Sequence, residues 1–254
     1  QELKGILDTV AESFPGQDAL EYTVEAGRPD TIDREKLQVL KDAGVTRISI
    51  NPQTLQDRVL QGIGRNHTAA QAVEAFHLAR EMGFQDINMD LIAGLPGDDL
   101  PGFCDTLDRV KQLSPENVTV HTLTVKRSSD IGGEYVSLYK ASQDQVSQMV
   151  DYAQKQLMEE GWRPYYLYRQ KNTIANLENV GYAKPGYESA YNILIMEEVH
   201  TILALGAGAV TKLVNPETGE IQRIYNFKYP YEYIRRFDEM MRRKEKVVSF
   251  FENP

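Results

Sequence analysis

The chain has 254 residues, of which 41% are hydrophobic and 26% charged, as in an ordinary globular protein. A net charge of -9 disfavours nucleic acid and anionic membrane surfaces as partners, because their phosphates would be repelled. No apolar run approaches the roughly 20 residues that cross a bilayer. The single cysteine, Cys104, excludes an intrachain disulfide and any metal site with three or four thiolates from this chain. A reducing, cytoplasmic compartment is the simplest expectation.

The first half of the sequence alternates between strand-like and helix-like segments. Runs that are β-branched or alternate in polarity predict strands at residues 20–25, 45–50, 84–92 and 118–125. Between these strands, apolar residues recur at helical spacing and predict helices. Thr68 is expected to cap the N-terminus of the helix that ends at Gly83. Strands joined through helices predict βαβ units and a parallel sheet. Such a sheet leaves an open edge at its first strand, which we expect to pair with further strands or to support self-association.

The character of the sequence changes after Lys126. The rest predicts, in order, a loop, an amphipathic helix, a strand, a second loop, a β-hairpin and a closing helix, at residues 128–133, 143–160, 164–168, 176–189, 213–225 and 231–246. We therefore place a boundary near residues 126–140 and predict two domains, residues 1–130 and 131–254.

Polar residues stand at or just beyond the ends of the four predicted strands: Glu25, Gln53, Asp90 and Thr124. Ligand sites of parallel α/β folds gather at the C-terminal ends of strands. A carboxylate there can accept hydrogen bonds from ribose hydroxyls or from an amino group. For any one residue the alternative is a hydrogen bond to a neighbouring loop, but four successive strand ends favour a ligand site.

Several segments resemble one known family. EYTVEAGRPDTID, GVTRISINPQTLQDRVLQGIGRNHT and INMDLIAGLPGDD look like the radical S-adenosylmethionine core of the oxygen-independent coproporphyrinogen III oxidases, and YRQKNTIANLENVGYAKPGYESAYN followed by LALGAGAV looks like their C-terminal part. The resemblance runs from about Ala19 to Val214 and is strongest to the HemZ-type branch, the coproporphyrinogen dehydrogenases.

The resemblance implies a fold and a chemistry. The fold is α/β: a partial (βα) barrel of radical S-adenosylmethionine type with strands 3 to 6 only, followed by a mixed α+β C-terminal domain. In the family a [4Fe-4S] cluster on a CxxxCxxC loop cleaves S-adenosylmethionine reductively. The resulting radical abstracts hydrogen from porphyrinogen propionates, which lose CO2 and become vinyl groups in haem biosynthesis. The cofactor carries the hard chemistry and the protein orients it. The electron donor is not indicated.

Matching the motifs residue by residue implies a set of cofactor contacts. Glu25 in VEAG, Gln53 in INPQ and Asp90 in NMDLI match residues that contact S-adenosylmethionine, with Asp90 near the ribose. Arg65 in GIGRNH would face the methionine carboxylate, a task suited to a guanidinium fork. Thr124 in HTLTV falls where the chain approaches the cofactor.

Three residues are candidate substrate contacts. His67 follows Arg65 in a loop, and Tyr168 and Arg169 belong to an aromatic and basic group that suits an apolar macrocycle with acidic propionates. The alternative is a tyrosine-rich strand with surface cations. His121 lies on a strand and could line the barrel.

The CxxxCxxC loop, which belongs before Glu25, has no counterpart in the chain. Cys104 lies in a helix beyond the GLPG turn, where no cluster ligand is expected. We therefore expect a C-terminal fragment of a radical S-adenosylmethionine oxidoreductase, with no metal ligand and no catalytic residue in this chain and no activity alone. The alternatives are a haem-binding or haem-delivering relative, or a non-catalytic binding module that lost the cluster loop.

Overall fold

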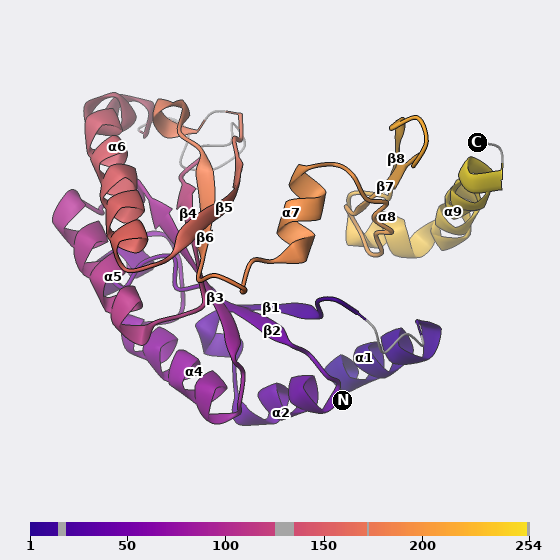
Figure 1. Ribbon diagram of the computed structural model, residues 1–254, viewed down its shortest axis with the longest axis horizontal. Coiled ribbons are helices and arrows are strands. Elements are labelled where there is room, and N and C mark those ends of the chain that lie inside the picture. The colour runs from indigo at the N-terminus through magenta and orange to yellow at the C-terminus, as the bar shows by residue number, and fades with distance from the viewer. Residues whose placement is uncertain (15–18, 125–134, 172, 253–254) are drawn as a thin grey trace. The chain divides into compact units, whose positions relative to one another are not determined.

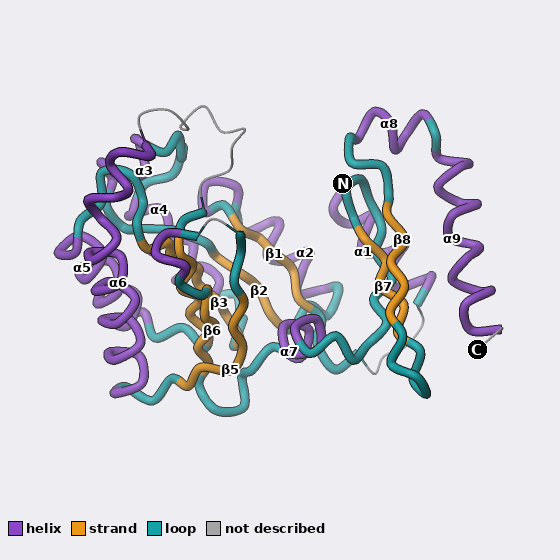
Figure 2. Tube along the Cα trace, turned by 90° about the horizontal axis from the view of Figure 1, so that it is seen from above, coloured by secondary structure: helices purple, strands orange, loops and turns teal. Residues whose placement is uncertain are grey.

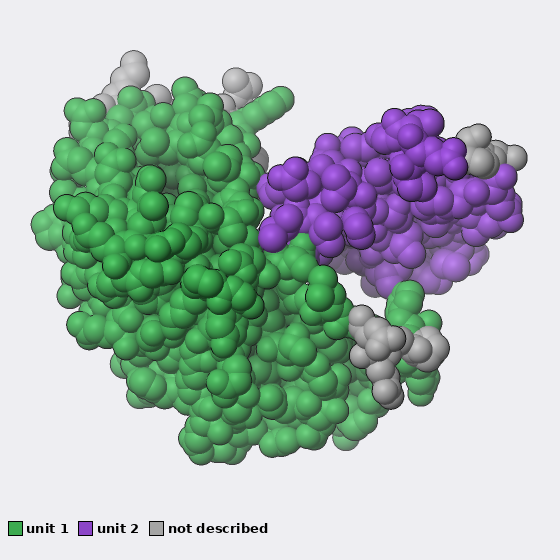
Figure 3. All heavy atoms as spheres, viewed as in Figure 1, with its two compact units in different colours: residues 1–190 green, residues 191–254 purple. Residues whose placement is uncertain are grey.

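The computed structural model describes residues 1–14, 19–124, 135–171 and 173–252. They fall into two compact units, residues 1–190 and 191–254, which Figure 3 distinguishes by colour. Within the described residues, no helix combines the length and the apolar character that a membrane crossing requires. The predicted loop at residues 128–133 lies outside the described residues.

The first unit is one six-stranded sheet with helices along it (Figures 1 and 2). Its strands are β1 (Thr23–Gly27), β2 (Arg47–Ile50), β3 (Asp86–Ala93), β4 (Asn117–Thr122), β5 (Arg163–Tyr168) and β6 (Asn179–Ala183). Its helices are α1 (Glu2–Ser13), α2 (Arg34–Asp42), α3 (Asp57–Gly62), α4 (Ala69–Glu81), α5 (Leu100–Leu113) and α6 (Tyr135–Glu159), with single turns at Pro29–Thr31 and Ile174–Asn176. The strand order is β1-β2-β3-β4-β6-β5.

The four predicted parallel strands are confirmed, since β1 to β4 pair in parallel in chain order. β6 and β5 then extend the sheet in antiparallel fashion. The prediction of a loop at residues 176–189 was wrong for Asn179–Ala183, which form strand β6. Its sequence NVGYA contains asparagine and glycine, which disfavour strands, and pairing with β4 on one side and β5 on the other overrides that local preference.

The sheet therefore continues to Ala183, and the compact units divide after Ala190. The predicted domain boundary near residue 130 stays a prediction. β1 forms one edge of the sheet, as expected, and the open sheet agrees with a partial barrel.

The two faces of the sheet differ in chemistry. Alternate residues of β2, β3 and β4 are fully buried aliphatic side chains that pack with α2, α4, α5 and α6: Ile48, Ile50, Ile87, Met89, Leu91, Val118 and Val120. Figure 1 shows these helices along the same side of the sheet. Because side chains alternate across a strand, the remaining residues point to the opposite face, which we call the inner face.

The second unit contains helix α7 (Ala190–Met196, which begins at the last residue of the first unit), strands β7 (Val210–Val214) and β8 (Ile221–Tyr225), and helices α8 (Pro230–Arg235) and α9 (Phe237–Glu252). The predicted hairpin is confirmed: Asn215 Oδ1 accepts hydrogen bonds from the backbone N–H groups of Glu217 and Thr218, which closes the turn. The single closing helix was wrong, because the chain leaves helical geometry at Arg236 between α8 and α9.

The predicted cap of α4 is confirmed and gives a stability test. Thr68 Oγ1 accepts from Gln71 N at 3.2 Å, and Gln71 Oε1 accepts from Thr68 N at 2.8 Å. We expect Thr68→Ala to lower the free energy of unfolding by about 1 kcal/mol, because the backbone N–H of Gln71 loses its acceptor. Thr9→Ala, on an exposed face of α1, is the control and should change it by less than about 0.5 kcal/mol. Equal losses in urea denaturation would contradict the capping role.

Candidate functional site

The inner face carries polar side chains at alternate residues of three neighbouring strands. In the middle row, Asn88 Nδ2 donates to Ser49 Oγ at 2.7 Å, and Thr119 Oγ1 donates to Asn88 Oδ1 at 3.1 Å. All three residues are buried. Buried polar groups need partners, and these side chains supply each other across β2, β3 and β4.

A second row closes the N-terminal ends of the same strands. Arg47 Nη1 lies 3.3 Å from Asp86 Oδ2, and Asn117 Nδ2 donates to Asp86 Oδ1 at 3.0 Å. Arg47 and Asn117 also donate to the carbonyl of Tyr187, at 3.2 and 2.9 Å. This row ties the segment after β6 to the sheet and leaves the opposite, C-terminal end for a site.

The row at the C-terminal ends contains two predicted residues, Glu25 and Asp90. Asn51 Nδ2 donates to Glu25 Oε2 at 3.4 Å, and Ser49 Oγ donates to Asn51 Oδ1 at 3.0 Å. Asn88 Nδ2 donates to Asp90 Oδ1 at 2.7 Å. One hydrogen-bonded path thus links the carboxylates of β1 and β3, and it brings the two predicted residues into one site.

Glu25 is electrostatically strained by this arrangement. Loss of hydration, and then the negative charge of Asp90, raise the pKa of Glu25 above its ordinary value of 4.5. Hydrogen bonds from Asn51 and Ser49 and the charge of Arg47 act in the opposite direction. Two carboxylates facing one surface form a site that favours a ligand with hydrogen-bond donors or positive charge.

The raised pKa predicts a stability change in Glu25→Gln. The folded chain holds the Glu25 proton more tightly than the unfolded chain, so the ionised carboxylate slightly destabilises the fold at pH 7. The effect is small, because Glu25 is exposed and solvent screens its charge. That penalty disappears as the pH falls below 4.5. We expect Glu25→Gln to have a higher Tm than the wild type at pH 7, and the gain to vanish near pH 4. Glu74→Gln, on the exposed side of α4, is the control; the same gain in both variants would contradict the strain.

Gln53 lies at the centre of the site in an unusual conformation. Its φ is 67°, and its backbone joins the ladder by donating to Asp90 O at 3.0 Å and accepting from Ile92 N at 2.9 Å. Its side chain is only 8% exposed, yet Oε1 has no hydrogen-bond partner among the described residues. The hydroxyl of Thr124, beyond the end of β4, is also buried and unpartnered within the described part of the chain. A buried unpaired acceptor costs roughly 1–3 kcal/mol. Both atoms therefore indicate a site for a ligand that can donate hydrogen bonds to them.

Arg65 and His67 follow α3 in one loop but differ in surroundings. Arg65 is partly exposed and makes no side-chain hydrogen bond or ion pair with another described residue. His67 is 2% exposed, and its Nε2 lies 3.2 Å from the carbonyl of Pro52. Burial lowers the pKa of His67, so the ring is neutral at pH 7. The structure places His67 beneath the loop that carries Gln53, where it braces Pro52. Its role as a substrate contact stays a prediction.

The other two predicted substrate contacts lie at the far edge of the sheet. The Tyr168 hydroxyl lies 3.3 Å from His121 Nδ1, whereas Arg169 is paired with Glu178 on the surface. The rings of Tyr166 and Tyr168 are parallel, with centroids 6.4 Å apart. Of the two predicted residues, the structure therefore brings only Tyr168 into the polar rows of the inner face.

The polar partners of the site residues were missed by the sequence analysis: Ser49, Asn51, Asn88 and Thr119. A pattern was available, since RISIN, DINMD and NVTVH each place polar residues at every second position. Alternation was taken as a sign of a strand and not of a polar face, so these positions within the strands were not considered.

Cys104 lies on α5 and is partly exposed. Burial, and then Asp108, raise the pKa of its thiol, which disfavours the thiolate that a metal would require. Among the described residues, no group of three or more histidine, cysteine, aspartate or glutamate side chains is placed to hold a metal ion.

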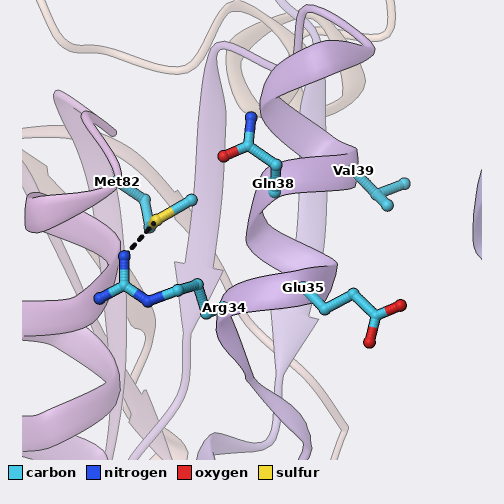
Figure 4. Close-up of a pocket in the computed structure, with 5 residues that line it drawn as sticks. All are labelled: Arg34, Glu35, Gln38, Val39 and Met82. Atoms are coloured by element: carbon cyan, nitrogen blue, oxygen red, sulfur yellow. Dashed lines mark hydrogen bonds between the residues drawn. The ribbon is translucent and has the colours of Figure 1, made fainter.

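A shallow pocket lies on the outer surface, between α2 and the end of α4 (Figure 4). It is lined by Arg34, Glu35, Gln38, Val39 and Met82. The Arg34 guanidinium donates hydrogen bonds to Glu81 and to the sulfur of Met82. The helices that form this pocket cover the aliphatic side of the sheet, so it has no access to Asp90.

Comparison with known proteins agrees with this geometry. Residues 6–110 match the model of the Radical SAM superfamily. Over 250 residues the chain is 46% identical to the oxygen-independent coproporphyrinogen-III oxidase-like protein HemZ of Bacillus subtilis, covering 98% of this chain and 50% of HemZ. It is 30% identical to the heme chaperone HemW of Haemophilus influenzae, covering 91% of this chain and 56% of HemW.

A solved structure has the same fold. Coproporphyrinogen III oxidase HemN from Escherichia coli matches with a TM-score of 0.69 at 21% identity, over 94% of this chain and 53% of HemN. The chain thus spans about half the length of the relatives that it matches. The sequence similarity, the open parallel sheet and the polar residues at its strand ends agree: residues 6–110 carry a radical SAM domain, and the chain is similar to the oxygen-independent coproporphyrinogen III oxidases.

Proposed function

We propose that this chain supplies the S-adenosylmethionine-binding strands of a radical SAM oxidoreductase that converts porphyrinogen propionates to vinyl groups. The observation that carries the proposal is the 46% identity to the coproporphyrinogen-III oxidase-like protein HemZ over 98% of this chain. The gathering of Glu25, Gln53 and Asp90 at one edge of the sheet supports it.

The residues present fit S-adenosylmethionine. Its ribose hydroxyls and ammonium group are donors, and the inner face offers the carboxylates of Glu25 and Asp90 as acceptors. The unpartnered Gln53 Oε1 and Thr124 Oγ1 are buried polar atoms that a ligand could satisfy. Arg65 is a partly exposed guanidinium suited to the methionine carboxylate. These residues would bind and orient the cofactor.

The residues present do not fit the [4Fe-4S] cluster. The chain has one cysteine, and that cysteine has a raised pKa. We propose that the three cluster ligands come from residues outside this sequence. Anaerobic reconstitution of the chain with iron and sulfide should leave negligible iron bound after desalting. Incorporation of about four iron atoms per chain would contradict this assignment.

The activity test uses the protein encoded by the complete reading frame that contains this chain. When bound, S-adenosylmethionine supplies the radical that abstracts hydrogen. Each propionate then loses CO2, one hydrogen atom and one electron to leave a vinyl group, and the electron passes to an acceptor that remains to be identified. Mass spectrometry after anaerobic incubation with coproporphyrinogen III should show this loss. Asp90→Asn should lower the rate by about tenfold or more, because the cofactor loses an ionic acceptor.

Haem delivery is a second candidate, favoured by the 30% identity to the heme chaperone HemW over 91% of this chain. Stoichiometric haem binding by the same protein, with no vinyl product under reducing anaerobic conditions, would support delivery. Vinyl formation would support the oxidoreductase.

A further inference from the structure

Three side chains, Asp90, His121 and Tyr168, form a chain across the inner face from β3 through β4 to β5. His121 Nε2 lies 3.6 Å from Asp90 Oδ2, and His121 Nδ1 lies 3.3 Å from the Tyr168 hydroxyl. The rings of His121 and Tyr168 meet edge to face at 6.4 Å and 68°. The cofactor contacts proposed above give His121 no role.

The partners of His121 determine which ring nitrogen carries the proton. The distance from Nε2 to Asp90 Oδ2, 3.6 Å, is too long for a direct hydrogen bond, but the negative charge of an ionised Asp90 favours the proton of neutral His121 on Nε2, the nitrogen that faces it. Nδ1 is then an acceptor for the Tyr168 hydroxyl. If the ring gains a second proton, Nδ1 becomes a donor, the Tyr168 oxygen accepts, and the ring carries a full positive charge beside Asp90. His121 can therefore exist in two charge states without losing either neighbour.

The two oxygens of Asp90 are held differently. Oδ1 accepts from Asn88 at 2.7 Å, a normal hydrogen-bond distance. Oδ2 has His121 as its neighbour at 3.6 Å, which is too long for a direct hydrogen bond. The carboxylate is thus fixed through Oδ1, whereas Oδ2 remains open to another donor. The side chains of His121 and Asp90 are 26% and 17% exposed, so a ligand can reach them.

We propose that His121 is a positioning residue whose charge decides whether Asp90 Oδ2 is open to the ribose of S-adenosylmethionine. This inference rests on the cofactor site proposed above. Neutral His121 leaves Oδ2 available. Protonated His121 forms an ion pair with Asp90 that competes with the ribose, and its positive charge opposes the sulfonium and ammonium of the ligand. The titratable groups that face this pair from the described elements are Tyr166 and Tyr168 on β5 and Glu25 on β1.

The test measures the dissociation constant of S-adenosylmethionine for the chain at about pH 8 and about pH 5.5, a range in which histidine titrates. Saturation-transfer difference NMR suits weak binding. We expect wild-type affinity to fall about three- to tenfold at the lower pH, as for a charge a few ångströms away near a surface. His121→Gln should lose most of that fall, and His77→Gln, on the exposed side of α4, should retain it. Adenosine has the ribose but neither charge. Its affinity should also fall at the lower pH, but by a smaller factor, because only the competition for Oδ2 remains.

Histidine NMR provides a readout that a merely structural role would not move. The ¹⁵N shifts of His121 should report the Nε2–H tautomer at about pH 8. The opposite tautomer overturns the inference. Ligand binding with the same pH dependence in the wild type and His121→Gln also overturns it, while the proposed cofactor site stands. No binding at either pH contradicts the proposed cofactor site itself.

Discussion

Replacing Arg80 with methionine is expected to destabilise the chain by about 2 kcal/mol, because it leaves a largely buried carboxylate with only Lys184, 3.7 Å away, as a cationic partner. Arg80 Nη2 donates to both oxygens of Glu116, at 2.7 and 2.6 Å, and Nη1 donates to the carbonyls of Phe84 and Gln85. Glu116 in turn accepts from Ile87 N at 3.1 Å. The pair thus holds the starts of β3 and β4, the strands that carry Asp90 and His121.

The matched control is Arg34→Met, which removes another arginine–glutamate pair. Arg34 and Glu81 are 58% and 63% exposed, against 25% and 10% for Arg80 and Glu116. An exposed pair contributes about 0–1 kcal/mol, so Arg34→Met should change the free energy of unfolding little. Arg80→Lys keeps the charge without the planar fork and should fall between the two. Similar losses for Arg80→Met and Arg34→Met in urea denaturation would show that burial of the Glu116 pair is unimportant.

Gly181→Ala is the second large effect that we expect. A Cβ added at Gly181 of β6 would lie 1.8 Å from Cε1 of Tyr166, because the tyrosine ring crosses over this glycine towards Thr119. The ring would have to leave, at a cost of about 1–3 kcal/mol from lost packing and overpacking. Since Tyr166 is parallel to Tyr168, we also expect the contact of Tyr168 with His121 to weaken.

The controls for Gly181→Ala separate the clash from a general effect of glycine. Gly5, on α1, has nothing within 4 Å of an added Cβ, so Gly5→Ala should stabilise the chain by about 0.5–1 kcal/mol through helix propensity. In a Tyr166→Ala background, Gly181→Ala should cost much less than in the wild type. An equal cost in both backgrounds would mean that the ring is not what excludes a side chain.

Much of the fold followed from local pattern. The β-branched run before Ile50 and the helical spacing between Thr68 and Gly83 act within a few residues, and both elements formed as predicted. β6 did not follow, because NVGYA has weak strand character and becomes a strand through pairing with β4 and β5. Such pairing depends on contacts between residues far apart in sequence.

The candidate site was predictable to a similar degree. The rule that ligands gather at strand ends indicated Glu25, Gln53 and Asp90, and the structure brings these three together. The rule could not reveal the contact of His121 with Tyr168, 47 residues away, because it depends on β5 lying beyond β6 in the sheet. It also could not show that His67 is buried beneath the loop of Pro52, since a histidine in a polar loop is typical of a surface.

The most direct test of the account compares S-adenosylmethionine binding by the wild-type chain and by Gln53→Met, with Gln61→Met on α3 as the control. Methionine has a similar length to glutamine but no acceptor, so it removes the unpartnered Oε1 of Gln53. The account predicts that the ligand-free variant is at least as stable as the wild type, and that it binds S-adenosylmethionine about tenfold or more weakly. Unchanged binding in Gln53→Met would contradict the assignment of the strand ends as the cofactor site.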